Sequence, residues 1–157
     1  MKRIAIVLLI VGISACHGWH LRGEKTQLAV NSVYLTGQAG IVHQLIKEQL
    51  SRKNVLATLP DNALTLALEK ELIRRRTASV KGNGSTKEFE LILTIDYQIL
   101  NANQALRTKT QVRVIRSYIF DENDVASKDK EEMILRKDMQ RTAARQILQQ
   151  LQLLQRQ

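Results

Sequence analysis

Apolar side chains recur along the chain with two different periods, and each period predicts one kind of element. Residues 41–53 carry apolar side chains three and four positions apart, among them Val42, Leu45 and Ile46, which predicts a helix with one apolar face. Residues 89–100 instead alternate between apolar and polar side chains, which predicts a half-buried strand. The two patterns together indicate a protein that contains both helices and a sheet.

Three further strands are predicted over residues 30–36, 63–81 and 108–120. The strand 63–81 is expected to be long and bulged. Its first part alternates between apolar and polar side chains, and the next strong turn signal, Gly82 to Ser85, comes only after residue 81. Within it, residues 69–76 (EKELIRRR) leave strand and helix both open, because they also have good helical propensity.

A second helix is predicted from Ser127 to about Leu154. Ser127 is a suitable N-cap, and Asp129, Glu131 and Glu132 place negative charge near the positive end of the helix dipole. The buried stripe of this helix is expected to consist of Met139, Ala143, Ile147, Leu151 and Leu154, with Ala144 and Leu148 beside it.

The predicted order of elements is therefore β-α-β-β-β-α. A sheet with one apolar face needs a cover, and two amphipathic helices supply it. We expect an α+β two-layer sandwich: a four-stranded mixed sheet with both helices on one face. The first two strands, which flank the first helix, are expected to be parallel and the others antiparallel.

The composition adds a charge and a compartment. The 24 Lys and Arg residues exceed the 15 Asp and Glu residues by nine, which favours an anionic partner. Residues 1–15 have the character of a signal peptide, with Lys2 and Arg3 before the apolar run from Ile4 to Ile13, which is too short to span a bilayer. Small residues then precede Cys16, the only cysteine, as in the lipobox of bacterial lipoproteins.

This pattern predicts cleavage before Cys16, with an S-diacylglycerol and an N-acyl group on the new N-terminus. The acyl chains would anchor the protein in a membrane, and residues 16–28 would form an arm between anchor and domain. Because His17 rather than an aspartate follows the cysteine, the outer membrane is the expected destination. The processed chain would keep 22 basic residues against 15 acidic ones and would meet no nucleic acid, so an anionic lipid or glycolipid is the expected partner.

Several local strings, taken in order, carry a resemblance to a known family. They are Gly18-Trp19-His20-Leu21-Arg22 directly after the lipobox, Thr77-Ala78-Ser79-Val80 before the Asn83-Gly84 turn, Arg116 to Phe120, and Ala126 to Asp129. Together they resemble the LptE family of lipopolysaccharide-assembly lipoproteins, and the similarity covers nearly the whole chain. On this basis residues 29–157 are interpreted as a single LptE-like domain.

The resemblance implies a function without catalysis. Members of the family plug the lumen of the outer-membrane barrel LptD, help that barrel to assemble, bind lipopolysaccharide and take part in its delivery to the outer leaflet. The resemblance thus implies LptD and lipopolysaccharide as partners, and a lipid-anchored position at the periplasmic side of the outer membrane and within the barrel lumen.

Basic residues near the predicted turns are the candidate binding residues. Lys and Arg pair with phosphate through charge-assisted hydrogen bonds, and the phosphates of lipid A are anionic. Lys81 and Lys128 rank first because they also lie in the family-like strings, followed by Lys87 and Arg76. A merely solvated positive surface is the competing interpretation.

Other chemistry has little support in the sequence. There is no Gly-x-Ser-x-Gly string, the one cysteine is taken up by the anchor, and His17, His20 and His43 do not form a metal-binding pattern. Neither an enzyme nor a cofactor is expected, and Trp19 is expected to pack the arm onto the domain. The alternative function is that of a stand-alone periplasm-facing lipoprotein that binds anionic lipid or peptidoglycan.

Overall fold

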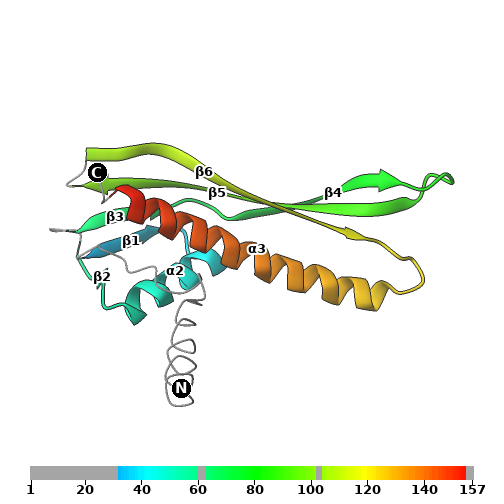
Figure 1. Ribbon diagram of the computed structural model, residues 1–157, viewed down its shortest axis with the longest axis horizontal. Helices are drawn as coiled ribbons and strands as arrows, with labels where there is room; N and C mark the ends of the chain where they lie inside the picture. Colours follow the sequence, from blue (N-terminus) through cyan, green and yellow to red (C-terminus); the bar gives the residue numbers. More distant parts are fainter. Residues whose placement is uncertain (1–31, 60–62, 102–103, 155–157) are drawn as a thin grey trace, which may run out of the picture.

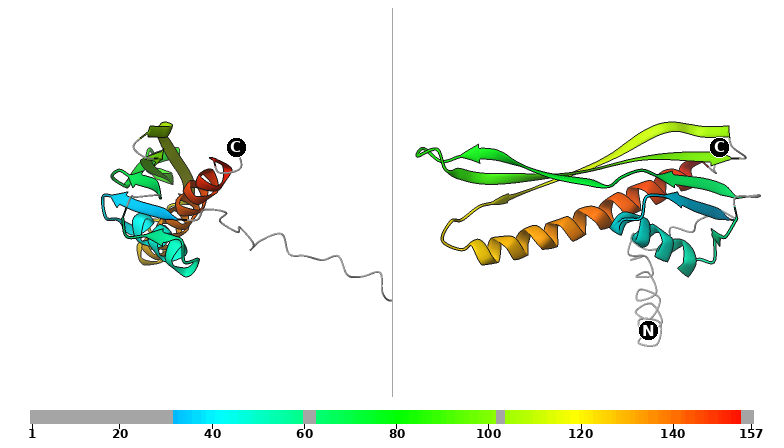
Figure 2. Two further views of the ribbon diagram at one scale, coloured as in Figure 1. Left: turned by 90° about the vertical axis from the view of Figure 1, so that its left-hand side faces the viewer. Right: turned by 180° about the vertical axis from the view of Figure 1, so that it is seen from behind.

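The computed structural model describes residues 32–59, 63–101 and 104–154, and these form one mixed sheet with two helices on one of its faces (Figures 1 and 2). The α+β class and the placement of the helices agree with the sequence prediction. Along the part of the chain that the structure describes, no helix is both long and apolar enough to cross a membrane. The predicted signal peptide, Cys16 and the arm with Trp19 and His20 lie outside the described residues.

The first half of the fold is a parallel crossover. Strand β1 (Val33–Gly37) leads into helix α2 (Ile41–Arg52), and the chain returns through the two-residue strand β2 (Leu56–Ala57) to strand β3 (Leu64–Leu68). Both β2 and β3 pair with β1 in parallel, one on each side. The expected parallel pair around the first helix is confirmed, and Asn54 ends that helix with a φ of 55°, as its tolerance of the left-handed region allows.

The second half is a long antiparallel unit. Strand β4 (Leu72–Val80) and strand β5 (Thr86–Asn101) form a hairpin, strand β6 (Gln104–Ile119) pairs along the other edge of β5, and helix α3 (Val125–Leu154) runs back beneath the sheet (Figure 1). Because β5 and β6 have 16 residues each, this unit extends far beyond the crossover half and makes the molecule elongated.

The prediction of four strands is wrong, since the described sheet has six. Two residues are too few to give β2 a readable period, and the expected strand 63–81 is divided into β3 and β4. These two strands nevertheless follow one another along the same edge of β5: β3 pairs with residues 97–101 of β5, and β4 pairs with residues 86–94. Between the two strands the chain has one residue more than the facing segment of β5. Residues 69–71 are therefore a bulge and residues 72–76 are strand, which settles the alternatives left open for residues 69–76.

The core lies between the sheet and the helices. The inward positions of β5 are Leu91, Leu93, Ile95, Tyr97 and Ile99, none more than 2% exposed, which confirms the predicted alternation. From α3 the predicted stripe of Met139, Ala143, Ile147 and Leu151 is fully buried against them, and Leu154 is half-buried at the end.

The N-cap of α3 lies three residues before the predicted one. The helix begins at Val125, and the amide of Ser127 donates to Asp124 Oδ1 over 3.4 Å. Asp124 therefore has the position and the side-chain contact of the N-cap, and Ser127 lies in the first turn. The shift follows from the loop before the helix, where Asp121 accepts hydrogen bonds from Asn123 and starts the turn earlier than the side-chain preferences of Ser127 suggest.

Candidate binding site

The β4–β5 turn lies at one end of the elongated molecule (Figure 1). The amide of Lys81 donates to the carbonyl of Ser85 over 2.7 Å, and Gly84 has a φ of +83° that few other residues adopt. Asn83 Oδ1 accepts hydrogen bonds from the amide and the hydroxyl of Ser85 and so closes the turn from inside. The turn holds Lys81 and Lys87 on the two strands that leave it.

The loop between β6 and α3 lies beside this turn. The amide of Phe120 donates to the carbonyl of Lys87 over 2.9 Å, and Lys81 Nζ lies 3.9 Å from Glu122 Oε1. Because α3 begins directly after this loop, the structure brings Lys81, Lys87 and Lys128 to the same end of the molecule, which the sequence could not establish.

The candidate basic residues differ in how far their charge is already neutralised. Lys128 Nζ lies 2.9 Å from Glu131 Oε2, and this hydrogen bond raises the pKa of Lys128 above its usual value. Lys87, by contrast, makes no side-chain hydrogen bond or ion pair with any residue that the structure describes.

Arg76 lies apart from the other three. It is on β4, five residues before Lys81, and its Nε lies 2.8 Å from Glu90 Oε1 on the neighbouring strand. We therefore define the basic end of the molecule as Lys81, Lys87 and Lys128, without Arg76.

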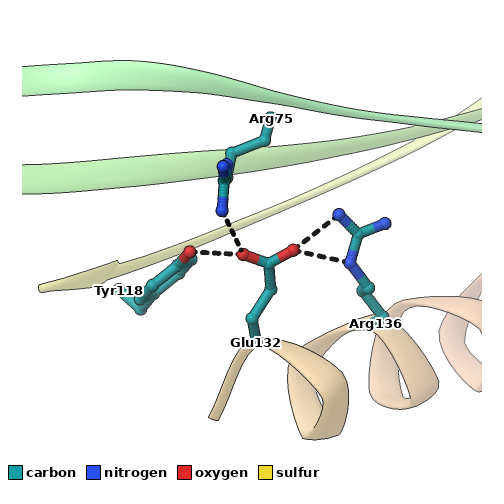
Figure 3. A network of polar contacts seen from close by, with 4 residues as sticks. All are labelled: Arg75, Tyr118, Glu132 and Arg136. Carbon is teal, nitrogen blue, oxygen red and sulfur yellow. Dashed lines mark hydrogen bonds and ion pairs between the residues drawn. The ribbon is translucent and has the colours of Figure 1, made fainter. Parts of the chain in front are cut away.

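A network of polar side chains ties the start of α3 to the sheet (Figure 3). Glu132 of α3, which is only 9% exposed, accepts hydrogen bonds from Tyr118 of β6 and from Arg75 of β4, the latter over 3.0 Å. Its other oxygen accepts from Arg136 Nε at 2.8 Å and Arg136 Nη2 at 2.6 Å. One carboxylate thus joins two strands and the helix, and both of its oxygens are satisfied.

The charges of this network favour the ionised form of Glu132. Burial alone would raise the pKa of Glu132, but hydrogen bonds from Tyr118, Arg136 and Arg75 outweigh it, so that the pKa is lowered. The pKa of Tyr118 is raised, first by burial and then by its hydrogen bond to Glu132. The pair therefore stays a phenol and a carboxylate at neutral pH.

Aromatic rings pack beside the network. Phe89 lies 5.8 Å from the ring of Tyr118 and 5.2 Å from that of Phe120 between centroids, and the Arg75 guanidinium lies 4.6 Å above Phe89. Half of the chain's few aromatic residues thus gather where the basic end joins the rest of the fold. This packing and the network together fix how the turn and the start of α3 lie relative to one another.

The roles of Glu132 and Arg75 were not predicted from the sequence. Glu132 was expected to act only on the helix dipole, and Arg75 stands between two other arginines, Arg74 and Arg76, from which its residue type does not distinguish it. In a strand, however, neighbouring side chains point to opposite faces, and the structure turns Arg75 toward α3 while Arg74 and Arg76 point away. The extra residue in the bulge sets this choice, so the alternation within 63–68 alone would not have predicted it.

The described residues contain no candidate metal-binding cluster. Within residues 32–59, 63–101 and 104–154, no three His, Cys, Asp or Glu side chains come together in a way that could bind an ion. His43 lies on α2, and its pKa is lowered by burial and then by the charge of Lys47. The positive charges of Lys81, Lys87 and Lys128 suit contact with an anion.

The described residues define a small α+β protein whose sheet extends into a long hairpin with a basic turn and is covered on one face by two helices. Residues 26–151 match the family described as LptE, Lipopolysaccharide-assembly, and the chain belongs to that family. This agrees with the resemblance seen in the sequence.

Individual relatives support the assignment. The LPS-assembly lipoprotein LptE of Pectobacterium atrosepticum is 28% identical over 151 residues, which cover 91% of this chain and 80% of the relative. Among solved structures, lipoprotein B from Nitrosomonas europaea has a TM-score of 0.73 at 27% identity, over 86% of this chain and 90% of its own. The rare lipoprotein B from Shewanella oneidensis has a TM-score of 0.69 at 26% identity, over 77% and 93% of the two chains.

Proposed function

We propose that this protein is an outer-membrane lipoprotein, anchored through lipids on Cys16, that plugs and helps to assemble an LptD-type barrel and contacts lipopolysaccharide on its way to the outer leaflet. Membership of the lipopolysaccharide-assembly family is the observation that carries the proposal. The anchor rests on the lipobox-like sequence before Cys16.

The shape and the surface of the molecule support a position inside a barrel. The face of the sheet that the helices leave open carries charged and polar side chains such as Arg76, Glu90 and Ser117 between its apolar ones. Since porin-type lumens are polar, such a face suits a wet contact with a barrel wall.

The basic end supports contact with the glycolipid. Lys81, Lys87 and Lys128 meet there from three segments of the chain, and Lys87 has no ion pair with a described residue. The carboxylates that pair with Lys81 and Lys128, those of Glu122 and Glu131, are 56% and 44% exposed to solvent. Such surface ion pairs are weak, so a phosphate can bind these lysines beside the carboxylates or in their place. Arg76 is a weaker candidate, because its guanidinium group already forms an ion pair with Glu90.

Two experiments test the proposal. The tagged full-length protein, extracted in mild detergent, is expected to retain a barrel protein of the LptD type; recovery without any barrel would overturn the plug function and leave the stand-alone lipoprotein. Mass analysis of the processed N-terminus should show the acyl groups on Cys16, and an unmodified thiol would contradict the anchor.

A charge-reversal pair tests the glycolipid contact. Lys81→Glu with Lys128→Glu is expected to weaken binding of lipopolysaccharide about tenfold at low salt, and less at high salt, because surface ion pairs are screened. The matched control is Lys47→Glu with Lys137→Glu, two exposed lysines on the helices away from the turn. If the wild type and the Lys81→Glu, Lys128→Glu variant bind lipopolysaccharide equally well at every ionic strength, the basic end is only a solvated positive surface.

A further inference from the structure

A groove of about 530 Å³ lies on the open face of the sheet, where β4, β5 and β6 run side by side. It is separate from the basic end, since its strand positions lie several residues from the β4–β5 turn. The residues that line it are Glu69, Lys70, Leu72, Arg74, Ile92, Thr94, Asp96, Gln111 and Arg113. The family assignment and the candidate basic residues do not account for it.

The acidic side chains of the groove are already neutralised. Lys109 Nζ lies 2.8 Å from Glu69 Oε2 and 3.4 Å from Asp96 Oδ2, and Gln111 donates to Asp96 Oδ1 over 2.8 Å. These contacts lie at one end of the groove and leave little negative charge to face a ligand.

The cationic side chains of the groove are not neutralised in this way. The side chains of Lys70, Arg74 and Arg113 make no hydrogen bond or ion pair with any part of the chain that the structure describes. Arg75 and Arg76, on either side of Arg74 in the sequence, are ion-paired with Glu132 and Glu90. The guanidinium groups of Arg74 and Arg113 are therefore able to bind an anionic ligand in the groove.

The strand register fixes how the two arginines lie. Leu72, Thr94 and Arg113 are direct partners across the three strands, and Arg74 is opposite Ile92 in the next outward row. Arg74 and Arg113 consequently stand on opposite sides of β5 on one face, with β4 and β6 separated by two strand spacings, about 10 Å. Between them, on β5, the floor is formed by Ile92 and Thr94, and Leu72 borders it on β4.

We propose that this groove binds the phosphorylated sugar headgroup of lipopolysaccharide, as a second contact besides the basic end. The inference rests on the proposed function, because it takes the same glycolipid as the ligand. Arginine matches phosphate with two parallel hydrogen bonds. Two strand spacings and an offset of two residues along the strands place the backbones of the two arginines about 12 Å apart, which suits a headgroup with more than one phosphate.

The remaining lining residues favour a sugar over a protein surface. Thr94, Asp96 and Gln111 offer hydroxyl, carboxylate and amide groups that hydrogen-bond to sugar hydroxyls. The apolar side chains of Leu72 and Ile92 suit the less polar face of a sugar ring. Protein interfaces, in contrast, are enriched in aromatic anchors, and none of the residues that line the groove is aromatic.

A charge-removing pair tests the site by affinity. In the full-length protein, Arg74→Gln with Arg113→Gln is expected to weaken binding of purified lipopolysaccharide about tenfold, and to leave binding of the same material unchanged once its phosphates have been removed. The control Arg141→Gln with Arg145→Gln removes the same charge from exposed positions on α3 and should bind like the wild type. Equal loss in both pairs would reduce the effect to net charge and overturn the site.

Photo-crosslinking in cells separates this inference from the proposed function. A photoreactive residue in place of Thr94, on the floor of the groove, is expected to form an adduct with lipopolysaccharide, as is one in place of Asn83 in the turn. An adduct at position 83 alone overturns the groove and keeps the proposed function. If neither position forms an adduct with lipopolysaccharide, both the groove site and the proposed function are overturned. If position 94 forms adducts with protein alone, the groove is a protein interface and the inference is wrong.

Discussion

Gly37 ends strand β1 in a conformation that only glycine adopts readily. Its φ is +113°, and a Cβ atom built on it would lie 1.9 Å from the carbonyl oxygen of Leu68 on the paired strand. Because the clash is with backbone, a rotamer change cannot relieve it. The glycine therefore allows β1 and β3 to stay paired to the point where the chain turns into α2.

Gly37→Ala is accordingly expected to cost about 3 kcal/mol or more of folding stability, from the strained backbone and the clash together. Urea unfolding monitored by circular dichroism measures the difference. The control is Gly82→Ala, where an added Cβ meets nothing within 4 Å and the loss should stay below about 0.5 kcal/mol. Similar midpoints for the two variants would contradict this account of Gly37.

At the level of elements, the sequence predicts most where the period is long and unbroken. The alternation in β5 and the 3.6-residue stripe of α3 identify the buried side chains correctly, because each pattern repeats over many residues. It predicts least at residues 69–71, where one additional residue shifts the faces of everything that follows. A bulge is specified by its neighbours in space, here β5, and those are not visible in the local sequence.

The bulge has a structural consequence in Glu71. Its carboxylate accepts a hydrogen bond from the amide of Val42 over 3.1 Å in the first turn of α2, and another from Gln140 of α3. The N-terminus of α2 has no cap from its own flanking residue, since Gly40 has no side chain. A residue 29 positions away thus supplies the cap and joins both helices to the sheet.

Glu71→Ala should then lower stability by about 1 to 3 kcal/mol, since it leaves the Val42 amide and the buried Gln140 side chain without their acceptor. Hydrogen exchange should speed up first in the initial turn of α2. The matched control is Glu69→Ala in the same bulge, which loses only an exposed ion pair with Lys109 and should cost less than about 1 kcal/mol. An unchanged first turn of α2 in the Glu71 variant would rule out the capping role.

The candidate site was predicted in part. The basic turn follows from the Gly-Asn-Gly signal, and its meeting with the start of α3 follows from the order of elements only once the strand lengths are known. The groove and the Glu132 network depend instead on which face each arginine of β4 takes. That choice is set by the bulge, so a sequence pattern could list these arginines but not assign them.

For the molecule as a whole, the Glu132 network links the fold to the basic end. Since the pKa of Glu132 is lowered in the folded state, its contribution is present above its unfolded value, about 4.3, and is lost as the pH falls through the folded value. Glu132→Gln is expected to be about 2 kcal/mol less stable than the wild type at pH 7, a figure reduced because both arginines are partly exposed. The difference should shrink below about pH 4, and urea unfolding at pH 7, 5 and 3 would show it.

The same substitution separates positioning from contact with the ligand. Glu132 does not face the solvent, so under the proposed function Glu132→Gln should weaken lipopolysaccharide binding a few-fold only by loosening the start of α3 against β4 and β6. Hydrogen exchange should then speed up in residues 125–131 and stay unchanged in α2. Lys87→Glu, at a side chain without an ion pair among the described residues, should instead weaken binding while exchange stays as in the wild type. Weakened binding in the Glu132 variant without faster exchange at the start of α3 would mean that the carboxylate acts on the ligand directly, and the rigid connection between core and basic end would have to be abandoned.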